Sequence, residues 1–289
     1  MSRFAEIQIK RIFCAPNYVR AFGIFWGIRL LLSVERRWPR KSHAVHSIKG
    51  PGFPAPVHLR KCVSDHAIFW QCLVMRQYDL SPFAQTARLL EQYRKIVAAG
   101  RSPIIIDAGG NIGLAAFWFA RTFPESSIIS VEPDPANFAL LQRNVAIFGD
   151  RVRPLHGAVT EIPKAMRIVN SEAGYASYQL EPADDSTEAM VNGFTINALS
   201  ASIDHGELFI VKIDIEGGQK FLFADHTDWI EQAHLIVIEI DDWQFPWQAT
   251  CETLFKEMSK RRFDYLIRGE NLFCYRHLPV YSTPQGDQY

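Results

Sequence analysis

The segment PIIIDAGGNIGLAAFWFA, residues 103–120, limits the fold more than any other part of this 289-residue chain. It opens with three consecutive isoleucines, a short β-branched run that is typical of a strand buried on both faces of a parallel sheet. A turn with two adjacent glycines follows, and small and aromatic residues then recur at helical spacing. A strand, a glycine-rich turn and a helix form half of a βαβ nucleotide-binding unit, so this segment predicts a ligand site at the turn.

The alternation of strand and helix patterns continues through the rest of the chain. Strands are predicted at residues 104–107, 128–132, 152–156, 209–214, 235–240, 265–267 and 272–275, and helices at 113–121, 135–148, 219–223 and 250–261. This order predicts an α/β fold, a Rossmann-like and mostly parallel sheet of seven strands with helices on both faces. The last two strands are expected to form a C-terminal antiparallel hairpin.

The proline- and glycine-rich stretch GPGFPAP, residues 50–56, cannot continue a helix and is the clearest linker. It predicts a basic, apolar helical arm with its linker over residues 1–55 and a second domain over 56–289. The helical lead-in of that domain covers 64–100 and its Rossmann-like core covers 101–289. Within the lead-in we expect one capped helix from Ser64 to Phe83 and a second from Pro82 to Ala99.

The sequence does not decide which surface the arm packs against. Its short apolar stretch contains Arg29 and is followed by basic residues, without the small-residue cleavage pattern of a signal peptide. Such a segment suits a helix packed on its own domain, a homodimer contact, or an amphipathic helix on a membrane surface. No apolar run approaches the roughly 20 residues that a membrane-spanning helix needs.

Charge and cysteine content narrow the class of protein. The chain has 31 basic and 31 acidic residues, so its zero formal charge gives no overall attraction for nucleic acid, and a nucleic-acid partner is disfavoured. The five cysteines are scattered and include no C-x-x-C pair, which argues against a disulfide framework and a zinc site. We therefore expect a cytoplasmic protein, with peripheral membrane contact through the arm left open.

The glycine turn carries the first candidate site residues, Asp107, Gly109, Asn111 and Gly113, in the pattern D-x-G-x-N-x-G. The dinucleotide fingerprint G-x-G-x-x-G has a different glycine rhythm. A carboxylate at the strand end would repel a diphosphate but attract a cationic amine, directly or through water. The pattern therefore favours S-adenosyl-L-methionine over NAD.

The second predicted strand ends on an acid as well. Glu132 follows the glycine turn by about 20 residues, a spacing at which an acidic side chain accepts hydrogen bonds from ribose hydroxyls. Pro133 and Asp134 begin a loop that is expected to flank the adenine. Taken alone, a glutamate at a strand end can simply be a solvated charge, and an Asp-Pro pair can simply begin a helix.

The segment LFIVKIDIEGGQKFL ends a third strand on Lys212, Asp214 and Glu216 at a spacing of two. Either these side chains meet a ligand at the carboxyl edge of the sheet, or Lys212 forms a structural ion pair with a carboxylate. The next strand ends with Glu239. If the strands are neighbours, Asp214, Glu216 and Glu239 surround one point, where they would supply a general base or hold a divalent cation.

These blocks, in this order, resemble the FkbM-type family of S-adenosylmethionine-dependent methyltransferases. The similarity runs from about Ser64 to Glu239. It departs at Gly110, where alanine is usual and a glycine is harmless in a tight turn, and at Gly218 and Gln219, where the family often has alanine and glutamate. The lost acid leaves open which carboxylate is the base and whether a metal takes part.

The resemblance implies a class I methyltransferase fold, bound S-adenosyl-L-methionine, and O-methylation of a hydroxyl on a carbohydrate, glycan or small-molecule natural product. It assigns the cofactor to Asp107, Gly109, Asn111, Gly113, Glu132, Pro133, Asp134, Ala158 and Tyr78. Catalysis falls to Asp214, Glu216 and Glu239, with Asp214 as the foremost candidate base. Asp65 and Tyr78 are expected to close the site from the N-terminal side.

Two rival functions remain open from the sequence. One is a catalytically inactive methyltransferase-like scaffold, held to a membrane or a partner protein by its arm. The other is an NAD-dependent oxidoreductase, which the missing G-x-G-x-x-G disfavours. Acceptor choice is expected to lie in the irregular segment 167–200, where Tyr175 and Tyr178 would stack on a sugar, and in the N-terminal segment.

Overall fold

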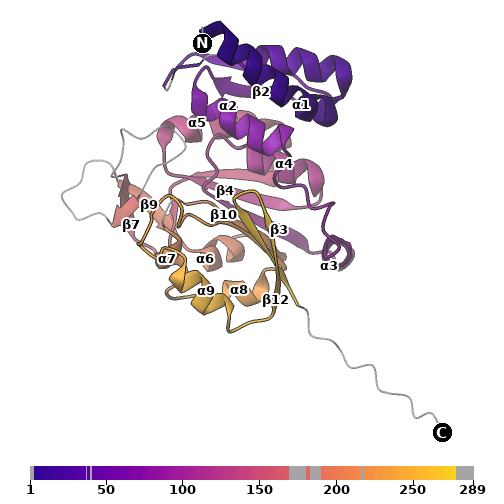
Figure 1. The fold of residues 1–289 in the computed structure, drawn as a ribbon. Coiled ribbons are helices and arrows are strands. Elements are labelled where there is room, and N and C mark those ends of the chain that lie inside the picture. Colours follow the sequence, from indigo (N-terminus) through magenta and orange to yellow (C-terminus); the bar gives the residue numbers. More distant parts are fainter. Residues whose placement is uncertain are drawn as a thin grey trace.

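The computed structural model describes residues 3–36, 38–39, 41–168, 180–182, 190–215 and 218–277 (Figure 1). Its main element is a seven-stranded sheet with the order β12-β13-β11-β10-β3-β4-β5. The strands are β3 (Ser102–Ala108), β4 (Ser127–Glu132), β5 (Val152–His156), β10 (Gly206–Ile213), β11 (Leu235–Glu239), β12 (Phe263–Arg268) and β13 (Asn271–Arg276). β13 runs antiparallel to both β11 and β12, and the other neighbouring strands of this sheet pair parallel. The predicted sheet and C-terminal hairpin are confirmed.

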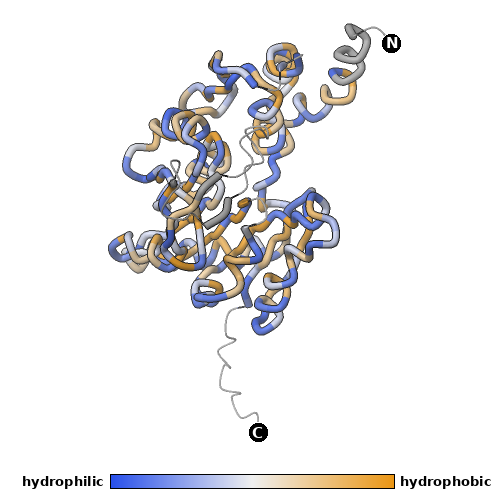
Figure 2. Tube along the Cα trace, turned by 90° about the vertical axis from the view of Figure 1, so that its left-hand side faces the viewer, coloured by the Kyte–Doolittle hydropathy of each residue, from blue (hydrophilic) through white to orange (hydrophobic). Residues whose placement is uncertain are grey.

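Helices cover both faces of the sheet, and each face has its own hydrophobic core (Figure 1). On one face pack α1 (Arg3–Val34), α2 (Val63–Phe69), α3 (Thr86–Ala98), α4 (Leu114–Thr122) and α5 (Pro135–Val145); on the other pack α6 (Ile196–Ala201), α7 (Gln219–Leu222), α8 (Trp229–Gln232) and α9 (Glu252–Met258). The isoleucine run of β3 serves both cores, because successive side chains of a strand point to opposite faces. Ile105 lies in the first core, and Ile104 and Ile106 lie in the second. In Figure 2, hydrophobic segments of the chain lie toward the inside of the molecule and hydrophilic segments toward its rim.

The strand order reverses between β3 and β10, and this places the site. In a parallel sheet such a switch point opens a crevice at the carboxyl ends of the strands. After β3 the chain turns through Gly109 (φ 80°) and Gly113 (φ 84°), whose left-handed conformations favour glycine, and α4 starts at Leu114. After β4, Asp134 caps α5 by accepting a hydrogen bond from Asn137 N at 2.7 Å.

The segment predicted as irregular contains regular structure in its described parts. A second sheet has the order β6-β9-β7-β8. Its strands are β6 (Ala158–Val159), β7 (Ala165–Ile168), β8 (Leu180–Pro182) and β9 (Met190–Phe194), and α6 follows it. The strands are short and pair with segments distant in sequence, so no local periodicity predicts them. Tyr175 and Tyr178 lie outside the described residues.

The helical lead-in differs from its prediction. The helix expected up to Phe83 is α2 followed by one π-helical turn, Trp70–Val74, and Arg76 then reverses the chain at φ 53°. Cys62 precedes α2 without a side-chain capping bond, so the predicted cap is wrong, and α3 begins at Thr86 rather than Pro82. The π-helical turn faces the site, because Gln71 and Cys72 line one of its pockets.

The N-terminal arm folds back on itself. α1 is two helices joined by a kink at Gly23, and Arg11 Nε donates a hydrogen bond to the carbonyl of Glu35 at 2.9 Å. The arm also contains β1 (Val45–Ile48), which pairs antiparallel with β2 (Val57–Arg60) across the predicted linker. This hairpin spans both sides of residue 55, and the division into domains there stays a prediction. Within the described ranges, no helix has the length and apolar character to cross a bilayer.

Candidate active site

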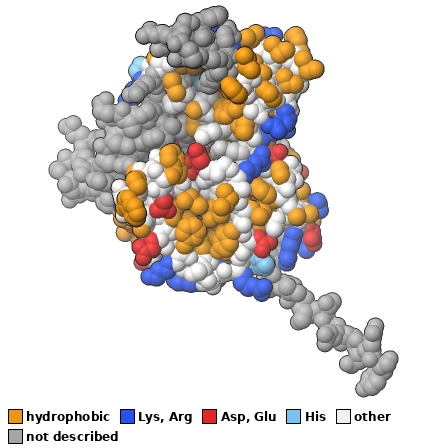
Figure 3. All heavy atoms as spheres, viewed as in Figure 1, with side chains coloured by type: hydrophobic (Ala, Val, Ile, Leu, Met, Phe, Trp, Pro, Cys, Tyr) orange, Lys and Arg blue, Asp and Glu red, His pale blue; other side chains and the backbone are white. Residues whose placement is uncertain are grey.

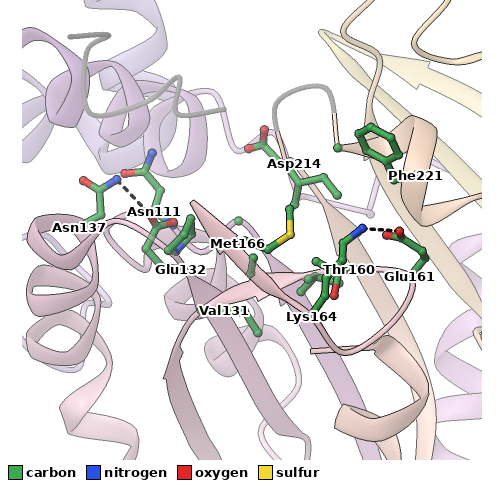
Figure 4. Close-up of a pocket in the computed structure, with 17 residues that line it drawn as sticks. Asn111, Val131, Glu132, Asn137, Thr160, Glu161, Lys164, Met166, Asp214 and Phe221 are labelled. Carbon is green, nitrogen blue, oxygen red and sulfur yellow. Dashed lines mark hydrogen bonds and ion pairs between the residues drawn. The ribbon is translucent and has the colours of Figure 1, made fainter. Parts of the chain in front are cut away.

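A first pocket lies at the carboxyl ends of β3, β4 and β10 (Figure 4). Its empty volume is about 770 Å³, including space open to solvent, which lies in the range of small-molecule sites. Six of the residues predicted from the sequence line it together: Gly109, Asn111, Glu132, Pro133, Ala158 and Asp214. Sequence reasoning missed the opposite wall, formed in part by Lys164, Met166 and Phe221, because β7 and α7 reach the pocket only through tertiary packing.

Glu132 is held firmly at the end of β4. One carboxylate oxygen accepts a hydrogen bond from Asn111 N at 2.8 Å; the other accepts from Asp134 N at 3.0 Å and from Asn137 Nδ2 at 3.2 Å. Burial raises the pKa of Glu132 to about 7, although these donors act in the opposite direction. The result is a fixed hydrogen-bond acceptor on the pocket wall.

Behind Glu132 runs a chain of buried polar side chains. Asn137 Oδ1 accepts a hydrogen bond from Arg60 Nη2 at 2.6 Å, and the Arg60 guanidinium pairs with Asp65, with Nη2–Oδ1 at 2.8 Å and Nε–Oδ2 at 3.0 Å. Asp65 was expected to close the site from the N-terminal side. In the structure it contacts Arg60 and does not line the pocket. Sequence reasoning missed Asn137, although it lies only five residues after Glu132.

Asp107 and Lys212 form a buried ion pair under the glycine turn. Lys212 Nζ lies 3.1 Å from Asp107 Oδ1 and 3.5 Å from Asp214 Oδ2, and it donates a hydrogen bond to the carbonyl of Gly109 at 2.6 Å. Burial disfavours the lysine charge, but Asp107 and Asp214 outweigh burial and hold the pKa of Lys212 well above its ordinary value. The structural ion pair is thus present, and Asp107 supports the turn from below instead of lining the pocket.

Three further residues at the turns act through the backbone or through packing. Gly113 and Asp134 line neither pocket; they begin α4 and cap α5. Gly110 is more than a harmless replacement in this chain, because a Cβ atom there would lie 2.2 Å from Ser130 Oγ and 2.6 Å from Leu141 Cδ1. Ser130 Oγ in turn donates to Asp107 Oδ2 at 2.7 Å.

A second pocket adjoins the first and shares Gly109, Asn111 and Asp214 with it. Its empty volume is about 810 Å³, including open space. Two other predicted residues, Tyr78 and Glu239, line it from the lead-in and from β11. The remaining polar lining was not predicted and includes Gln71, Gln77, Gln244, Glu270 and the exposed indole of Trp243. Asp214 was predicted because it stands at the carboxyl end of a strand. Trp243 and Gln244 also follow a strand end, so the same reasoning could have found them.

The second pocket carries net negative charge. Asp214, Glu239 and Glu270 stand on its wall, while the charge of Lys212 is already paired with Asp107. Glu216, the third predicted carboxylate, lies outside the described residues. In the part of the chain that the structure describes, no group of three His, Cys, Asp or Glu side chains is placed to hold a metal ion.

Comparison with known proteins agrees with this geometry. The family model for the methyltransferase FkbM domain matches residues 107–266, more than half of the chain. The chain is 46% identical over 70 residues to Methyltransferase 1 of Beauveria bassiana, covering 24% of this chain and 22% of that protein. It is 41% identical over 46 residues to Methyltransferase sdnD of Sordaria araneosa, covering 16% and 18%. The matches thus span about a fifth of each relative.

Solved structures show more distant likeness. A methyltransferase from Geobacter sulfurreducens is 18% identical, with a TM-score of 0.33 over 66% of this chain and 78% of that one. Monomeric WbdD is 10% identical, with a TM-score of 0.41 over 72% and 43%. The family match and the strand order carry the assignment: this chain belongs to the FkbM methyltransferase family and has the class I methyltransferase fold.

Proposed function

We propose that this methyltransferase transfers a methyl group from S-adenosyl-L-methionine to a hydroxyl group of a neutral, polyhydroxylated acceptor, such as a carbohydrate, glycan or small natural product. The observation that carries the proposal is the junction of the two pockets. Gly109, Asn111 and Asp214 line both. A cofactor in the first pocket and an acceptor in the second would therefore meet beside a carboxylate.

The lining of the first pocket suits this cofactor. The Glu132 carboxylate accepts hydrogen bonds, as the two ribose hydroxyls require, and the apolar side chains of Val131, Pro133 and Met166 offer surfaces to an adenine ring. Asn111 lies toward the second pocket and would contact the methionine end. The acidic surroundings favour a ligand that carries a sulfonium and an ammonium group.

The protein's part in the reaction is alignment and proton removal. When bound, the cofactor supplies an electrophilic methyl group on a sulfonium, which is a good leaving group. The acceptor oxygen would form its bond to the methyl carbon as the carbon–sulfur bond breaks and the neutral thioether leaves, and Asp214 would take the hydroxyl proton. Glu239, on the same pocket wall, would orient the acceptor through a second hydroxyl.

The lining of the second pocket supports the acceptor class. The amides of Gln71, Gln77 and Gln244 both donate and accept hydrogen bonds, as hydroxyl groups do. Trp243 offers a flat apolar surface on which the C–H face of a sugar ring can pack. Three carboxylates repel phosphates and carboxylates, so an anionic acceptor is disfavoured.

Calorimetric titration comes first, with S-adenosylmethionine, S-adenosylhomocysteine and NAD against the protein and its Glu132→Gln variant. We expect saturable binding of both sulfur nucleosides, no binding of NAD, and at least about tenfold weaker binding to the variant. Transfer of an isotopically labelled methyl group is then measured with pairs of neutral oligosaccharides and their phosphate esters, and with primary amines. Label on an oxygen of the neutral member supports the proposal.

Other outcomes would contradict it. Faster methylation of the phosphate ester would exclude the acceptor class, and label on nitrogen would exclude the O-methyl assignment. A folded protein that binds neither nucleoside would make an inactive scaffold the better account.

A further inference from the structure

The chain separates its charge between the arm and the rest. Ten of the 55 residues of the arm and its linker are lysine or arginine and two are acidic, whereas the remaining 234 contain 21 basic and 29 acidic residues. The zero net charge of the whole therefore conceals a strongly basic arm and an acidic body. A segment of this kind attracts anionic surfaces even when the whole protein is neutral.

The second helix of the arm has an apolar outer face. After the kink at Gly23, the side chains of Ile24, Phe25, Ile28 and Leu32 are 71%, 70%, 48% and 51% exposed. Ile24, Ile28 and Leu32 recur every four residues and Phe25 lies three residues before Ile28, so all four lie on one side of the helix. Leu30, Leu31 and Val34 point the other way into the core on the α1 side of the sheet. We call the four exposed residues the arm face; hydrophobic side chains gather over α1 in Figure 3.

Exposed arginines lie near the arm face along the chain. Arg20, Arg29 and Arg36 are exposed, and the guanidinium of Arg29 lies 5.2 Å from the centre of the Trp26 ring. Over residues 11–36, Glu35 is the one acidic side chain, and it is buried. Apolar and aromatic residues flanked by arginines, without exposed acids, are the composition of helices that lie in the interface of a bilayer.

We propose that the arm face docks on an anionic lipid surface, with its apolar side chains in the interfacial region and Arg20, Arg29 and Arg36 among the headgroups. This inference does not depend on the identity of the methyl acceptor. A second copy of the chain fits less well, because a symmetric contact would bring two basic arms together. Charge complementarity instead selects a negative partner surface, which a bilayer with anionic lipids supplies.

Flotation of the full-length protein with lipid vesicles tests the proposal. Vesicles of pure phosphatidylcholine are compared with vesicles that contain about 30 mol% phosphatidylserine. We expect binding to the anionic vesicles and little to the neutral ones. Arg20→Gln/Arg29→Gln should weaken binding about fivefold for each charge removed, and raised salt should act in the same direction.

Matched variants separate the arm face from exposed apolar residues in general. Ile24→Ser/Phe25→Ser should weaken vesicle binding at least about tenfold. The control, Ile267→Ser/Trp247→Ser, removes two side chains that are 74% and 100% exposed outside the arm, and it should bind as the unaltered protein does. Thermal unfolding and circular dichroism confirm that each variant is folded.

Light scattering tests the alternative that the arm face contacts a second copy of the chain. A dimer that Ile24→Ser/Phe25→Ser converts to a monomer, with no vesicle binding, would overturn the proposal and assign the arm face to a second copy. Failure of a folded protein to bind anionic vesicles would overturn it as well. Equal loss of binding in the control variant would show that the arm face is not the docking surface.

Discussion

Lys212 Nζ lies 3.1 Å from Asp107 Oδ1 across the neighbouring strands β10 and β3, where the two residues are partners in register. Their side chains are 2% and 0% exposed. The same ammonium group donates to the carbonyl of Gly109, so one buried pair links the two strands to the turn between both pockets. The pair thus belongs to the foundation of the site, and its charges depend on each other.

Removing the lysine should therefore cost more than a surface ion pair does. Lys212→Met leaves the Asp107 carboxylate buried without its partner, and we expect the free energy of unfolding to fall by about 3–5 kcal/mol. Lys95→Met breaks an exposed pair with Glu91 and should lower the free energy of unfolding far less. Urea denaturation measures both. The double variant Lys212→Met/Asp107→Leu should recover part of the loss, and equal losses in the two single variants would refute the argument.

Gly110 should resist enlargement because Ser130 occupies the space beside it. Gly110→Ala is expected to destabilise the fold by about 1–3 kcal/mol through overpacking. In combination with Ser130→Ala the cost should be smaller than the sum of the single effects, with a coupling of at least about 0.5 kcal/mol. A double-mutant cycle by denaturation measures this coupling, and strict additivity would show that Ser130 is not the obstacle.

The raised pKa of Glu132 predicts pH-dependent cofactor binding. The free carboxyl group holds a proton below about pH 7, whereas ribose hydroxyls bind to the carboxylate form. Affinity for S-adenosylhomocysteine should therefore fall by up to about tenfold per pH unit below 7, and binding there should release protons. Calorimetry in two buffers of different ionisation enthalpy measures both effects. Glu132→Gln should remove this dependence, and an unchanged pH profile in that variant would refute the assignment.

The same carboxyl group affects stability with the opposite sign to a paired acid. Because its folded-state pKa lies above the ordinary value of 4.5, the folded protein holds the proton more tightly than the unfolded chain between those two pH values. Its contribution to stability is therefore lost as pH rises from about 4.5 to about 7. Compared with Glu132→Gln, the unaltered protein should lose stability over this interval. A difference that grows in the other direction would contradict the raised pKa.

Asn137 should act as a positioning residue for Glu132. Asn137→Asp replaces the amide that donates to Glu132 Oε1 with a negative charge, so we expect cofactor affinity to fall about tenfold or more. The midpoint of its pH dependence should also move upward, which simple loss of packing would not cause. Asn197→Asp, on α6, is the control and should leave both quantities unchanged. A weaker affinity with an unmoved midpoint would exclude the positioning role.

The proposed base predicts a separation of turnover from binding. Asp214→Asn should lower kcat about 10²- to 10⁴-fold while the Kd for S-adenosylhomocysteine stays within about threefold. Glu239→Gln should mainly raise the KM for the acceptor. Asp225→Asn removes an exposed carboxylate outside both pockets and serves as the control. Full turnover in Asp214→Asn would exclude this residue as the base.

The seven-stranded sheet was predicted correctly because the sequence patterns that indicate its strands are local. Runs such as Ile104 to Ile106 indicate strands, and the glycine turn and the acid at Glu132 follow from conformational freedom and strand-end placement. The same reasoning failed where a local pattern competed with packing. The helix expected up to Phe83 gave way to a π-helical turn, and the apparently irregular segment contains strands that pair with distant ones.

By itself, the sequence determined the fold class, the glycine turn and six of the residues that line the first pocket. Only the tertiary structure decided which charges meet. It paired Lys212 with Asp107, connected Asp65 through Arg60 to Asn137, and gathered the lining of the second pocket from the lead-in and the loop after β11. The physical reason is range: backbone preference and periodicity act over a few residues, whereas burial and strand order join side chains that are far apart along the chain.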